Sequence, residues 1–337
     1  MVFQNVREGN DREDREERGD KRQSRQKRQK SGIVLTVLSS GKVQCPSWYN
    51  AGMTFWIIFL SGLILAVILL FAWNHKLNQS IQITQQSIEL DCLPPAFDGY
   101  RIVQVSDLHG NDPHDLIDKT KAFKPDLIAC TGDLFDGVQH AKTTYRVLKE
   151  LTEIAPVYFV SGNHEYYAGN WAERTVHLSK MGIHLLENEC TQIWKDHQCI
   201  ELCGIDDPDL NYRWSYARRL QQHQENLAKL PSKQDMIRIL LSHRADLFEE
   251  SLQADADLIL SGHIHGGHWR ILNKGILTPY NGDRFVFFPK YDAGLFRIGN
   301  CQMFVSRGLG DQMRIPRLLN PPELVWITLR RKSENKS

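Results

Sequence analysis

Five short polar clusters contain the residue types that hold metal ions in proteins. They are Ser106-Asp107-Leu108-His109, Gly132-Asp133, Gly162-Asn163-His164-Glu165, Ser242-His243 and Gly262-His263-Ile264-His265. Carboxylate and imidazole groups suit Mn, Fe or Zn, and the two oxygens of one carboxylate can bridge two metal ions. A spacing of two residues, as in Asp107/His109 and His263/His265, places both side chains on one side of an extended segment.

Each cluster taken alone is weak evidence for a metal site. An isolated Asp-x-His or Gly-His-x-His is more often a cap or a set of surface polar residues, and Gly before Asp or Asn is ordinary turn chemistry. Here all five clusters follow an apolar run, which makes coincidence a poor explanation. Together they predict one metal centre.

The apolar runs before the clusters predict the elements that position them. We expect buried strands at residues 102–105, 127–130, 157–160, 237–241 and 258–260. Amphipathic helical spacing lies between them, at Tyr145, Leu148, Leu151 and Ile154 and in residues 214–230. Functional groups of α/β sheets collect where strands end, so the clusters should converge. The glycines before them, Gly132, Gly162 and Gly262, let the backbone approach closely.

Length and composition fit a globular enzyme. The chain has 337 residues, of which 42% are hydrophobic and 24% charged. Its 41 basic and 40 acidic residues give a net charge of +1, so we expect no nucleic-acid partner.

We divide the chain into five parts: a polar tail (1–52), a transmembrane helix (53–73), a connector (74–98), an α/β catalytic domain (99–331) and a polar C-terminal tail (332–337). The N-terminal tail has few apolar residues up to about residue 30, so it cannot offset the entropy of ordering and is predicted to be disordered. Met53 is an alternative start, in which case the tail is not part of the working protein.

Residues 53–73 are uncharged over 21 residues, enough for a helix of roughly 30 Å that spans a bilayer. The alternative is a cleaved signal peptide. Such a peptide has an apolar region of about 7–15 residues that ends in small residues, whereas this segment runs on to Phe71 and Trp73.

The basic tail favours a cytoplasmic N-terminus, although Lys42 before the helix is matched by Lys76 after it. We therefore expect the catalytic domain on the outer face of a bacterial cytoplasmic membrane.

Seven cysteines lack the paired spacing of a structural zinc site. In a strand, Cys199 and Cys203 would share one face opposite Ile200 and Leu202, which indicates packing. In an oxidising compartment a bridge among Cys190, Cys199 and Cys203 is an open alternative.

The ordered series of clusters resembles the calcineurin-like metallophosphoesterases over residues 99–331. The resemblance implies an αββα sandwich with two divalent metal ions, either Mn, Fe or Zn. It implies that one metal is held by Asp107, His109 and His265, that the other is held by Asn163, His243 and His263, and that Asp133 bridges them. His164 would contact the phosphate or protonate the leaving group.

Within the family, the single helix, Gly266-Gly267 and the segment Ser306 to Gly310 resemble a bacterial membrane-anchored branch. Its members are phosphodiesterases or are related to UDP-diacylglucosamine diphosphatases. Ile264 and His268 replace the branch's usual Thr and Gln, which weakens substrate inference but leaves the metal ligands intact. We expect a phosphorylated small molecule or a lipid as substrate, with a lipid-linked diphosphatase and an inactive metal-binding scaffold as alternatives.

Other residues have open roles. Arg307 is a candidate phosphate contact, because its guanidinium group suits phosphate geometry. Asp136 could orient a ligand histidine or cap a turn or a helix. A third set could contact substrate or only shape the pocket wall: His268, Trp269 and Arg270. Residues 212–230 are the candidate lid or membrane-facing helix.

Overall fold

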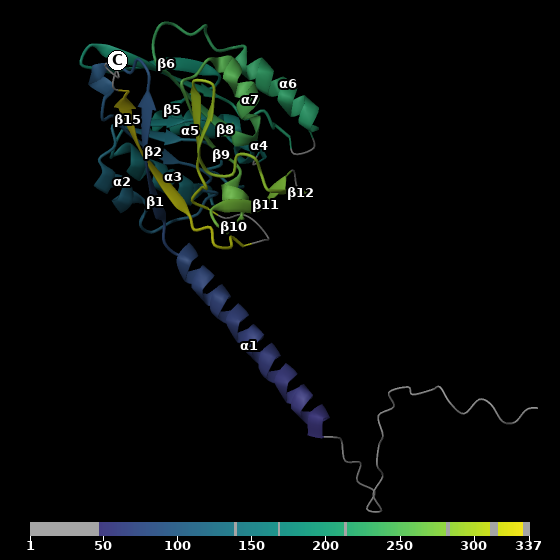
Figure 1. The fold of residues 1–337 in the computed structure, drawn as a ribbon. Helices are drawn as coiled ribbons and strands as arrows, with labels where there is room; N and C mark the ends of the chain where they lie inside the picture. Colours follow the sequence, from purple (N-terminus) through teal and green to yellow (C-terminus); the bar gives the residue numbers. More distant parts are fainter. Residues whose placement is uncertain are drawn as a thin grey trace, which may run out of the picture. The chain divides into compact units, whose positions relative to one another are not determined.

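The computed structural model describes residues 47–137, 140–167, 169–211, 214–280, 284–310 and 316–332 (Figure 1). The chain divides into two compact units, Met1–Val67 and Ile68–Ser337. Most of the predicted N-terminal tail, residues 1–46, lies outside the described residues, as does the end of the C-terminal tail.

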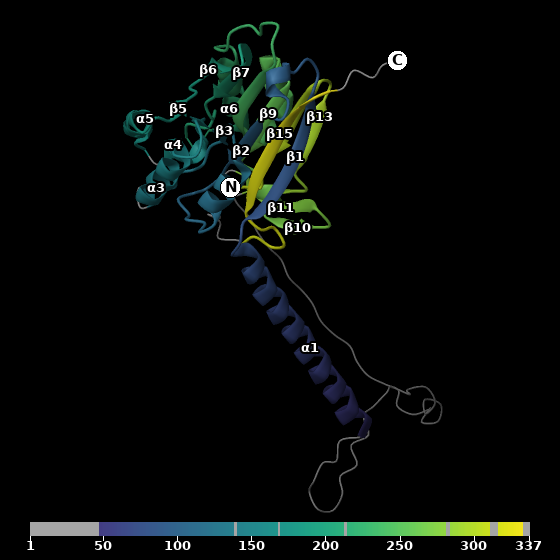
Figure 2. The same ribbon diagram turned by 90° about the vertical axis from the view of Figure 1, so that its left-hand side faces the viewer.

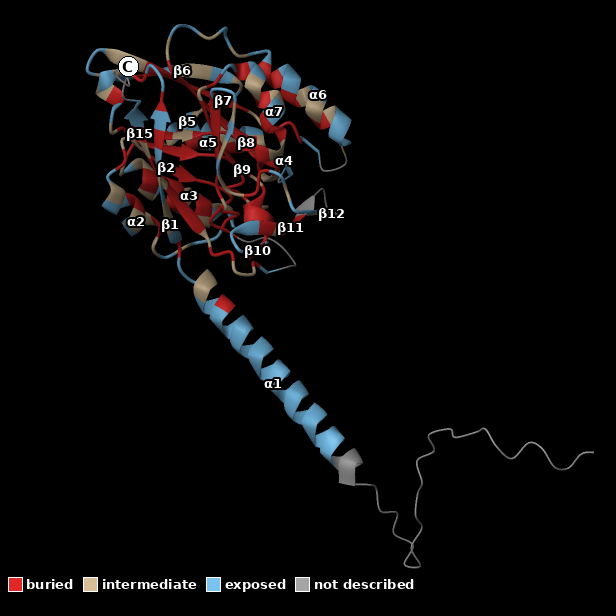
Figure 3. Ribbon diagram, viewed as in Figure 1, coloured by how far each residue is buried: buried red, intermediate tan, exposed pale blue. Residues whose placement is uncertain are grey.

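Helix α1 (Ser47–Asn78) contains the apolar segment. It extends past both ends of the predicted span at 53–73. Residues 74–78 contain neither proline nor glycine, so the polar residues there continue the helix, and at the other end the helix begins directly after Pro46 and includes Gly52. The part Ala51–Asn78 is long and apolar enough to cross a membrane. Its apolar side chains are exposed in the absence of a bilayer (Figure 3).

The first of two six-stranded sheets holds three of the predicted strands. Its order is β1 (Gln82–Leu90), β15 (Glu323–Arg331), β2 (Arg101–Val105), β3 (Leu127–Cys130), β4 (Val157–Phe159) and β5 (His184–Leu185). All neighbours are parallel except β15 and β2. The segment predicted as a connector, 74–98, therefore contributes strand β1 and the 3-10 helix η1 (Pro95–Phe97).

The second sheet holds the other two predicted strands. Its order is β13 (Gly294–Ile298), β14 (Cys301–Val305), β9 (Leu258–Gly262), β8 (Arg238–Arg244), β7 (Gln198–Ile205) and β6 (Glu189–Lys195). The four central strands are parallel and the two outer ones antiparallel.

Helices cover the outer face of each sheet (Figures 1 and 2). Alternate residues of one strand separate the layers: Ile102 faces the core between the sheets, whereas Val103 faces the helices. The first sheet packs against α2 (Leu116–Phe123), α3 (Ala141–Thr152) and α5 (Trp171–Lys180). The second packs against α6 (Tyr216–Leu227) and α7 (Phe248–Ser251). This arrangement confirms the predicted α/β sandwich, preceded by one long apolar helix.

The remaining elements are short. Helix α4 (Asn163–Tyr167) follows β4, and the 3-10 helices η2 (Ala245–Leu247) and η3 (Leu252–Ala254) flank α7. The 3-10 helix η4 (His265–Gly267) leads into a three-stranded antiparallel sheet of β10 (Trp269–Ile271), β11 (Lys274–Tyr280) and β12 (Arg284–Phe287). We call this the small sheet.

Candidate metal centre

The ends of five parallel strands bring the polar clusters together. Strands β2, β3 and β4 of the first sheet and β8 and β9 of the second carry them. Two separate groups result, and in each the candidate ligand atoms lie within 4.8 Å of one another. The first group is Asp107, His109 and His265, and the second is Asp133, His243 and His263. A third set, His109, Asp133 and His164, meets the same distance and shares a residue with each of them.

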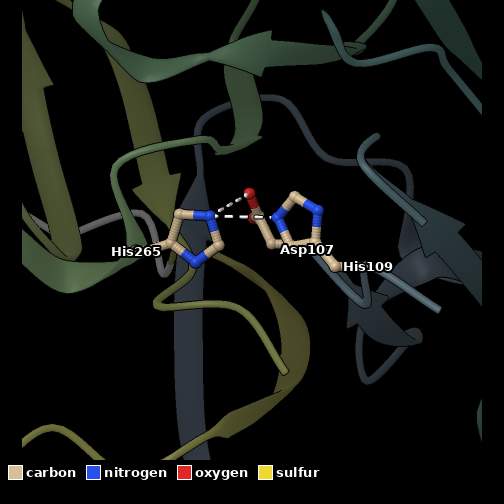
Figure 4. A group of neighbouring side chains, drawn as sticks. All are labelled: Asp107, His109 and His265. Atoms are coloured by element: carbon tan, nitrogen blue, oxygen red, sulfur yellow. Dashed lines mark hydrogen bonds and ion pairs between the residues drawn. The ribbon is translucent and has the colours of Figure 1, made fainter. Parts of the chain in front are cut away.

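The first group joins the two sheets. Nε2 of His265, from the loop after β9, lies 3.4 Å from Oδ1 of Asp107 and 3.1 Å from Nε2 of His109. Figure 4 shows the two imidazole rings with these nitrogens turned toward each other beside the Asp107 carboxylate. All three residues are buried, so a cation here would be held by protein groups with little competition from water.

In the second group, too, the candidate donor atoms point toward one another. Nε2 of His243 lies 3.1 Å from Oδ2 of Asp133 and 3.2 Å from Nδ1 of His263. Nδ1 of His243 donates to the carbonyl oxygen of Thr131 at 2.8 Å. That bond fixes the tautomer and leaves the Nε2 lone pair directed at the centre, as in most metal-binding histidines.

Asp133 lies between the groups. Its Oδ2 faces both His243 and, at 4.0 Å, Nε2 of His109, whereas its Oδ1 accepts the backbone N–H of His164 at 2.8 Å. A single oxygen therefore faces both groups, while the other holds the neighbouring loop.

Asn163 is the buried first residue of α4, directly after β4 and its loop. Its Oδ1 is buried and has no hydrogen-bond partner. A buried acceptor without a partner costs about 1–3 kcal/mol, and a metal ion would satisfy it. The donor set of nitrogens and oxygens fits Mn, Fe or Zn.

The backbone is strained where the candidate ligands sit. Left-handed φ angles between 49° and 73° occur at Asp107, His109, Asp133, His263 and His265. Such conformations cost about 1–3 kcal/mol each in non-glycine residues and persist where the surroundings enforce them. We infer that the loops are held in shape for the site.

All three predicted glycines permit the close approach expected of them, and Gly132 lies with its Cβ position 2.7 Å from Nδ1 of His243. A Cβ on Gly262 would lie 2.3 Å from Oδ2 of Asp107, and one on Gly162 would lie 2.2 Å from Oδ1 of Asp133. All three distances are too short for any side chain to fit, so glycine is required at these positions.

Three of the histidines are neutral at neutral pH. Burial lowers the pKa of His109 to about 3 and, with nearby positive charges, holds the pKa of His263 and His265 well below the ordinary value. Neutral imidazole is the form that binds metal. Burial also disfavours a charged His243, but the Asp133 carboxylate outweighs it and raises the pKa of His243 to about 10. Proton and metal therefore compete at His243.

His164 lies at the edge of the groups, where its ring centroid is 4.8 Å from that of His109. Its Nδ1 is 3.7 Å from Oδ1 of Asp136. Burial disfavours the charged ring, but the charges of Asp133 and Asp136 more than offset it and raise the pKa of His164. The structure therefore pairs Asp136 with His164, which is not one of the predicted metal ligands.

Sequence reasoning gave no role to Glu165, whose side chain hydrogen-bonds the backbone of two loops that carry candidate ligands. Its buried carboxylate accepts backbone N–H groups of Asp133, Leu134, Phe135 and Gly162 at 2.7–3.0 Å. One carboxylate thus ties the loop after β3 to the loop after β4. Hydrogen bonds to the backbone do not depend on which residue types supply the N–H groups. The sequence therefore contains no sign of this role other than the glutamate itself.

Two buried arginines lie behind the histidines and were also missed. Nη1 of Arg244 is 2.9 Å from Nε2 of His263, and the same guanidinium group pairs with Asp207 and Asp209. Nη2 of Arg317 is 3.1 Å from Nδ1 of His265. Arg244 directly follows His243, and this adjacency was the one sequence feature that could have indicated its place at the site.

Arg317 connects the centre to the end of α1. Nδ2 of Asn74 donates to the carbonyl oxygen of Arg317 at 2.7 Å, and Oδ1 of Asn74 accepts the N–H of Leu319 at 2.8 Å. Asn78 also donates to the Arg317 carbonyl, at 3.0 Å. Asn320 in turn donates to the carbonyl of His265 at 2.7 Å.

The remaining candidates have structural partners. The guanidinium group of Arg307 pairs with Glu323 at 3.1 Å and donates to Gln82 at 2.9 Å, so its phosphate contact stays a prediction. Arg270 is buried against Asp292 and the carbonyl of Gly266. The other two of that set differ in exposure: His268 is buried and Trp269 is partly exposed.

The candidate lid is only partly described, since residues 212–213 lie outside the described residues. Its residues Tyr216–Leu227 form α6, in which Nε2 of the buried His223 lies 2.9 Å from Oγ of Ser251 in α7. Ser215 caps this helix by accepting the N–H of Arg218. The described part of the lid candidate thus packs against the second sheet's helical layer.

Comparison with known proteins agrees with the geometry. Residues 100–267 match the family model of calcineurin-like phosphoesterases. The chain belongs to this family. Its members are hydrolases with a dinuclear metal centre, and the two Asp/His groups are the corresponding feature of this metallophosphoesterase.

Relatives of this metallophosphoesterase occur in several organisms. The uncharacterized metallophosphoesterase YkuE of Bacillus subtilis is 30% identical, over 74% of this chain and 86% of its own. The phosphodiesterase YaeI of Escherichia coli is 31% identical, over 68% and 82%. A transmembrane protein with metallophosphoesterase domain from Bos taurus is 28% identical, over 70% and 56%. These names give no link to UDP-diacylglucosamine.

Proposed function

We propose that this metallophosphoesterase is a membrane-anchored phosphodiesterase with two metal ions. One would be held by Asp107, His109 and His265, the other by Asn163, His243 and His263, with Asp133 between them. The observation that carries this proposal is Oδ2 of Asp133, which faces both groups of buried ligands. The name of the relative YaeI supports a diester as substrate.

The chain's own groups have separate tasks in the proposed reaction. Two divalent cations would offset the phosphate charge and lower the pKa of a nucleophilic water. His164 is placed to give a proton to the departing oxygen, and Asp136 orients its ring. Glu165 keeps the loops that carry Asp133 and Asn163 at their spacing.

Two observations support an anchored domain on the outer face of a bacterial cytoplasmic membrane. Helix α1 is long enough to span the bilayer and continues without a break to Asn74, which is buried in the second unit. A disulfide joins Cys190 of β6 to its directly paired neighbour Cys203 of β7. Disulfides persist in oxidising compartments, which lie outside the cytoplasmic membrane.

The first test uses the full chain in detergent with Mn²⁺ and bis(p-nitrophenyl) phosphate. Asp133→Asn keeps the size of the side chain but removes the charge between the two groups, so turnover should fall more than about 100-fold. Metal content, measured by mass spectrometry, should fall with it.

The matched control is Asp91→Asn, an exposed aspartate that pairs with Lys332 on the surface. It should leave turnover and metal content unchanged. Undiminished turnover in Asp133→Asn would rule out the proposed dinuclear centre.

The alternative of a lipid-linked diphosphatase is favoured by one observation, the exposed apolar side chains of the small sheet next to the metal loop. A panel of diesters and lipid diphosphates separates the two activities. Faster cleavage of the diphosphate would favour the alternative.

A further inference from the structure

The small sheet exposes large apolar side chains to solvent. Leu272 is 93% exposed and Phe287 65%, and Ile271 and Phe285 are about half exposed. Phe288, the residue directly after β12, is 68% exposed. Single exposed apolar residues are common on protein surfaces, but several together on one small element mark an interaction site.

The two-residue turn at the tip of this sheet contains a leucine, a residue type that such turns disfavour. Leu272 and Asn273 join β10 to β11, and both have positive φ angles, 49° and 65°. Such two-residue turns favour Asn or Gly, whereas a leucine at positive φ is strained. Both the positive φ angle and the exposure of the side chain make leucine unfavourable for stability at this position. We infer that this leucine has a role other than stabilising the fold.

The tip lies beside the end of the apolar helix. A cavity of about 600 Å³ is lined by Trp73 and Leu77 of α1 on one side and by Leu272 and Asn273 on the other. Tryptophans at the ends of membrane helices sit at the level of the lipid headgroups. If α1 spans the bilayer, Leu272 is at about that level too.

Charge at this surface also fits a membrane. Lys76 in the last turn of α1 and Lys274 after the turn are both exposed. Lysines close to a bilayer are attracted to anionic lipids by about 1 kcal/mol each. Apolar side chains flanked by lysines are the pattern of a surface that enters the headgroup region.

The small sheet is also tied to the metal loop. Nη1 of Arg270 in β10 donates to the carbonyl of Gly266 at 2.6 Å and pairs with Asp292, which accepts the N–H of Gly275 at 2.6 Å. Thr278 of β11 donates to the carbonyl of Ile264, between His263 and His265, at 3.3 Å. Whatever holds the small sheet therefore holds the loop that carries both histidines.

We propose that the small sheet is a second membrane contact: Leu272, Phe287 and Phe288 enter the headgroup region of the leaflet at which α1 ends. The metal centre then faces phosphate esters carried by lipids in that leaflet. This inference rests on the proposed anchoring by α1, and its second part also rests on the proposed diesterase activity.

The contact is tested without any assay of activity. A photoreactive benzoyl-phenylalanine replaces Phe287 in the full chain, which is placed in vesicles of phosphatidylethanolamine and phosphatidylglycerol at 3:1. The control position is Trp194 of β6, an aromatic residue 63% exposed. In Figures 1 and 2 β6 lies at the end of the second unit opposite the small sheet.

Illumination should give lipid adducts at position 287 and few at position 194. No lipid adduct at 287, equal yields at both positions, or an adduct to a second copy of the chain would overturn the proposal. Because the readout is a covalent adduct, it is informative even if the protein cleaves no diester.

The substrate class is tested with two esters that release the same p-nitrophenol: hexadecyl p-nitrophenyl phosphate in the vesicles and soluble bis(p-nitrophenyl) phosphate. Leu272→Asp/Phe287→Asp should lower the ratio of vesicle to soluble turnover about tenfold. The control pair, Val176→Asp/Trp194→Asp, changes two exposed apolar residues of α5 and β6, Val176 at 55% and Trp194 at 63% exposure. If the ratio of vesicle to soluble turnover is the same in both double variants, the substrate is not carried by lipids. If the parent chain cleaves neither ester, the proposed diesterase activity is refuted.

Discussion

At the scale of single residues, the metal ligands are the part of the site that a sequence can predict. Asp107, His109 and the other candidates sit directly after apolar strands, and parallel strands bring their carboxyl ends together. Glu165, Arg244 and Arg317 could not be assigned in this way. Their roles depend on burial against loops distant in the sequence, and nothing in an Arg or Glu alone signals burial.

The role of His164 leads to a prediction about leaving groups. p-Nitrophenolate can leave as an anion without being protonated. An alkoxide is a much stronger base, so its oxygen needs a proton as it leaves. His164→Gln should therefore slow cleavage of an alkyl phosphodiester by about 10²–10⁴-fold and that of a p-nitrophenyl diester much less. Equal losses on both esters would instead indicate a role in binding or folding. Asp136→Asn, which removes only the orienting carboxylate, should show the same preference with a smaller loss.

At the scale of elements, the strands that carry motifs were predicted and several others were not. The five apolar runs became β2, β3, β4, β8 and β9. Strand β1, with the sequence QITQQSIEL, reads as polar because it lies at the sheet edge with one face toward solvent. Its partner β15 lies some 240 residues later, so its pairing depends on the fold as a whole.

The packing of α6 gives a prediction about pH and stability. Burial, with the charge of Arg244, lowers the pKa of His223 to about 4, whereas in the unfolded chain it lies near its ordinary value of about 6.5. Between these values only the unfolded state takes up the proton, so stability is lost as the pH falls from about 6.5 toward 4.

His223→Gln removes this titration while keeping a polar group near Ser251. Between pH 7 and pH 4.5 the free energy of unfolding of the variant should fall by about 2 kcal/mol less than that of the parent. Urea unfolding in detergent, followed by tryptophan fluorescence, measures the difference. Parallel pH profiles would show that His223 does not titrate in this way.

At the scale of the whole molecule, the disulfide provides a test of the side on which the domain works. In the full chain unfolded without reductant after isolation from its native membrane, iodoacetamide should modify Cys45, Cys92, Cys130, Cys199 and Cys301 but not Cys190 or Cys203. Reduction should expose the remaining pair. Labelling of Cys190 and Cys203 without reduction would contradict an oxidising location.

The contacts of Asn74 set where the protein can be cut. Hydropathy alone suggests starting a soluble fragment just after the apolar segment, for example at residue 75. Such a fragment would lack the amide that holds both Arg317 and Leu319, and with it the support behind His265. A weak metal affinity in that fragment would reflect the position of the cut rather than the enzyme, so a faithful soluble form should begin before Asn74.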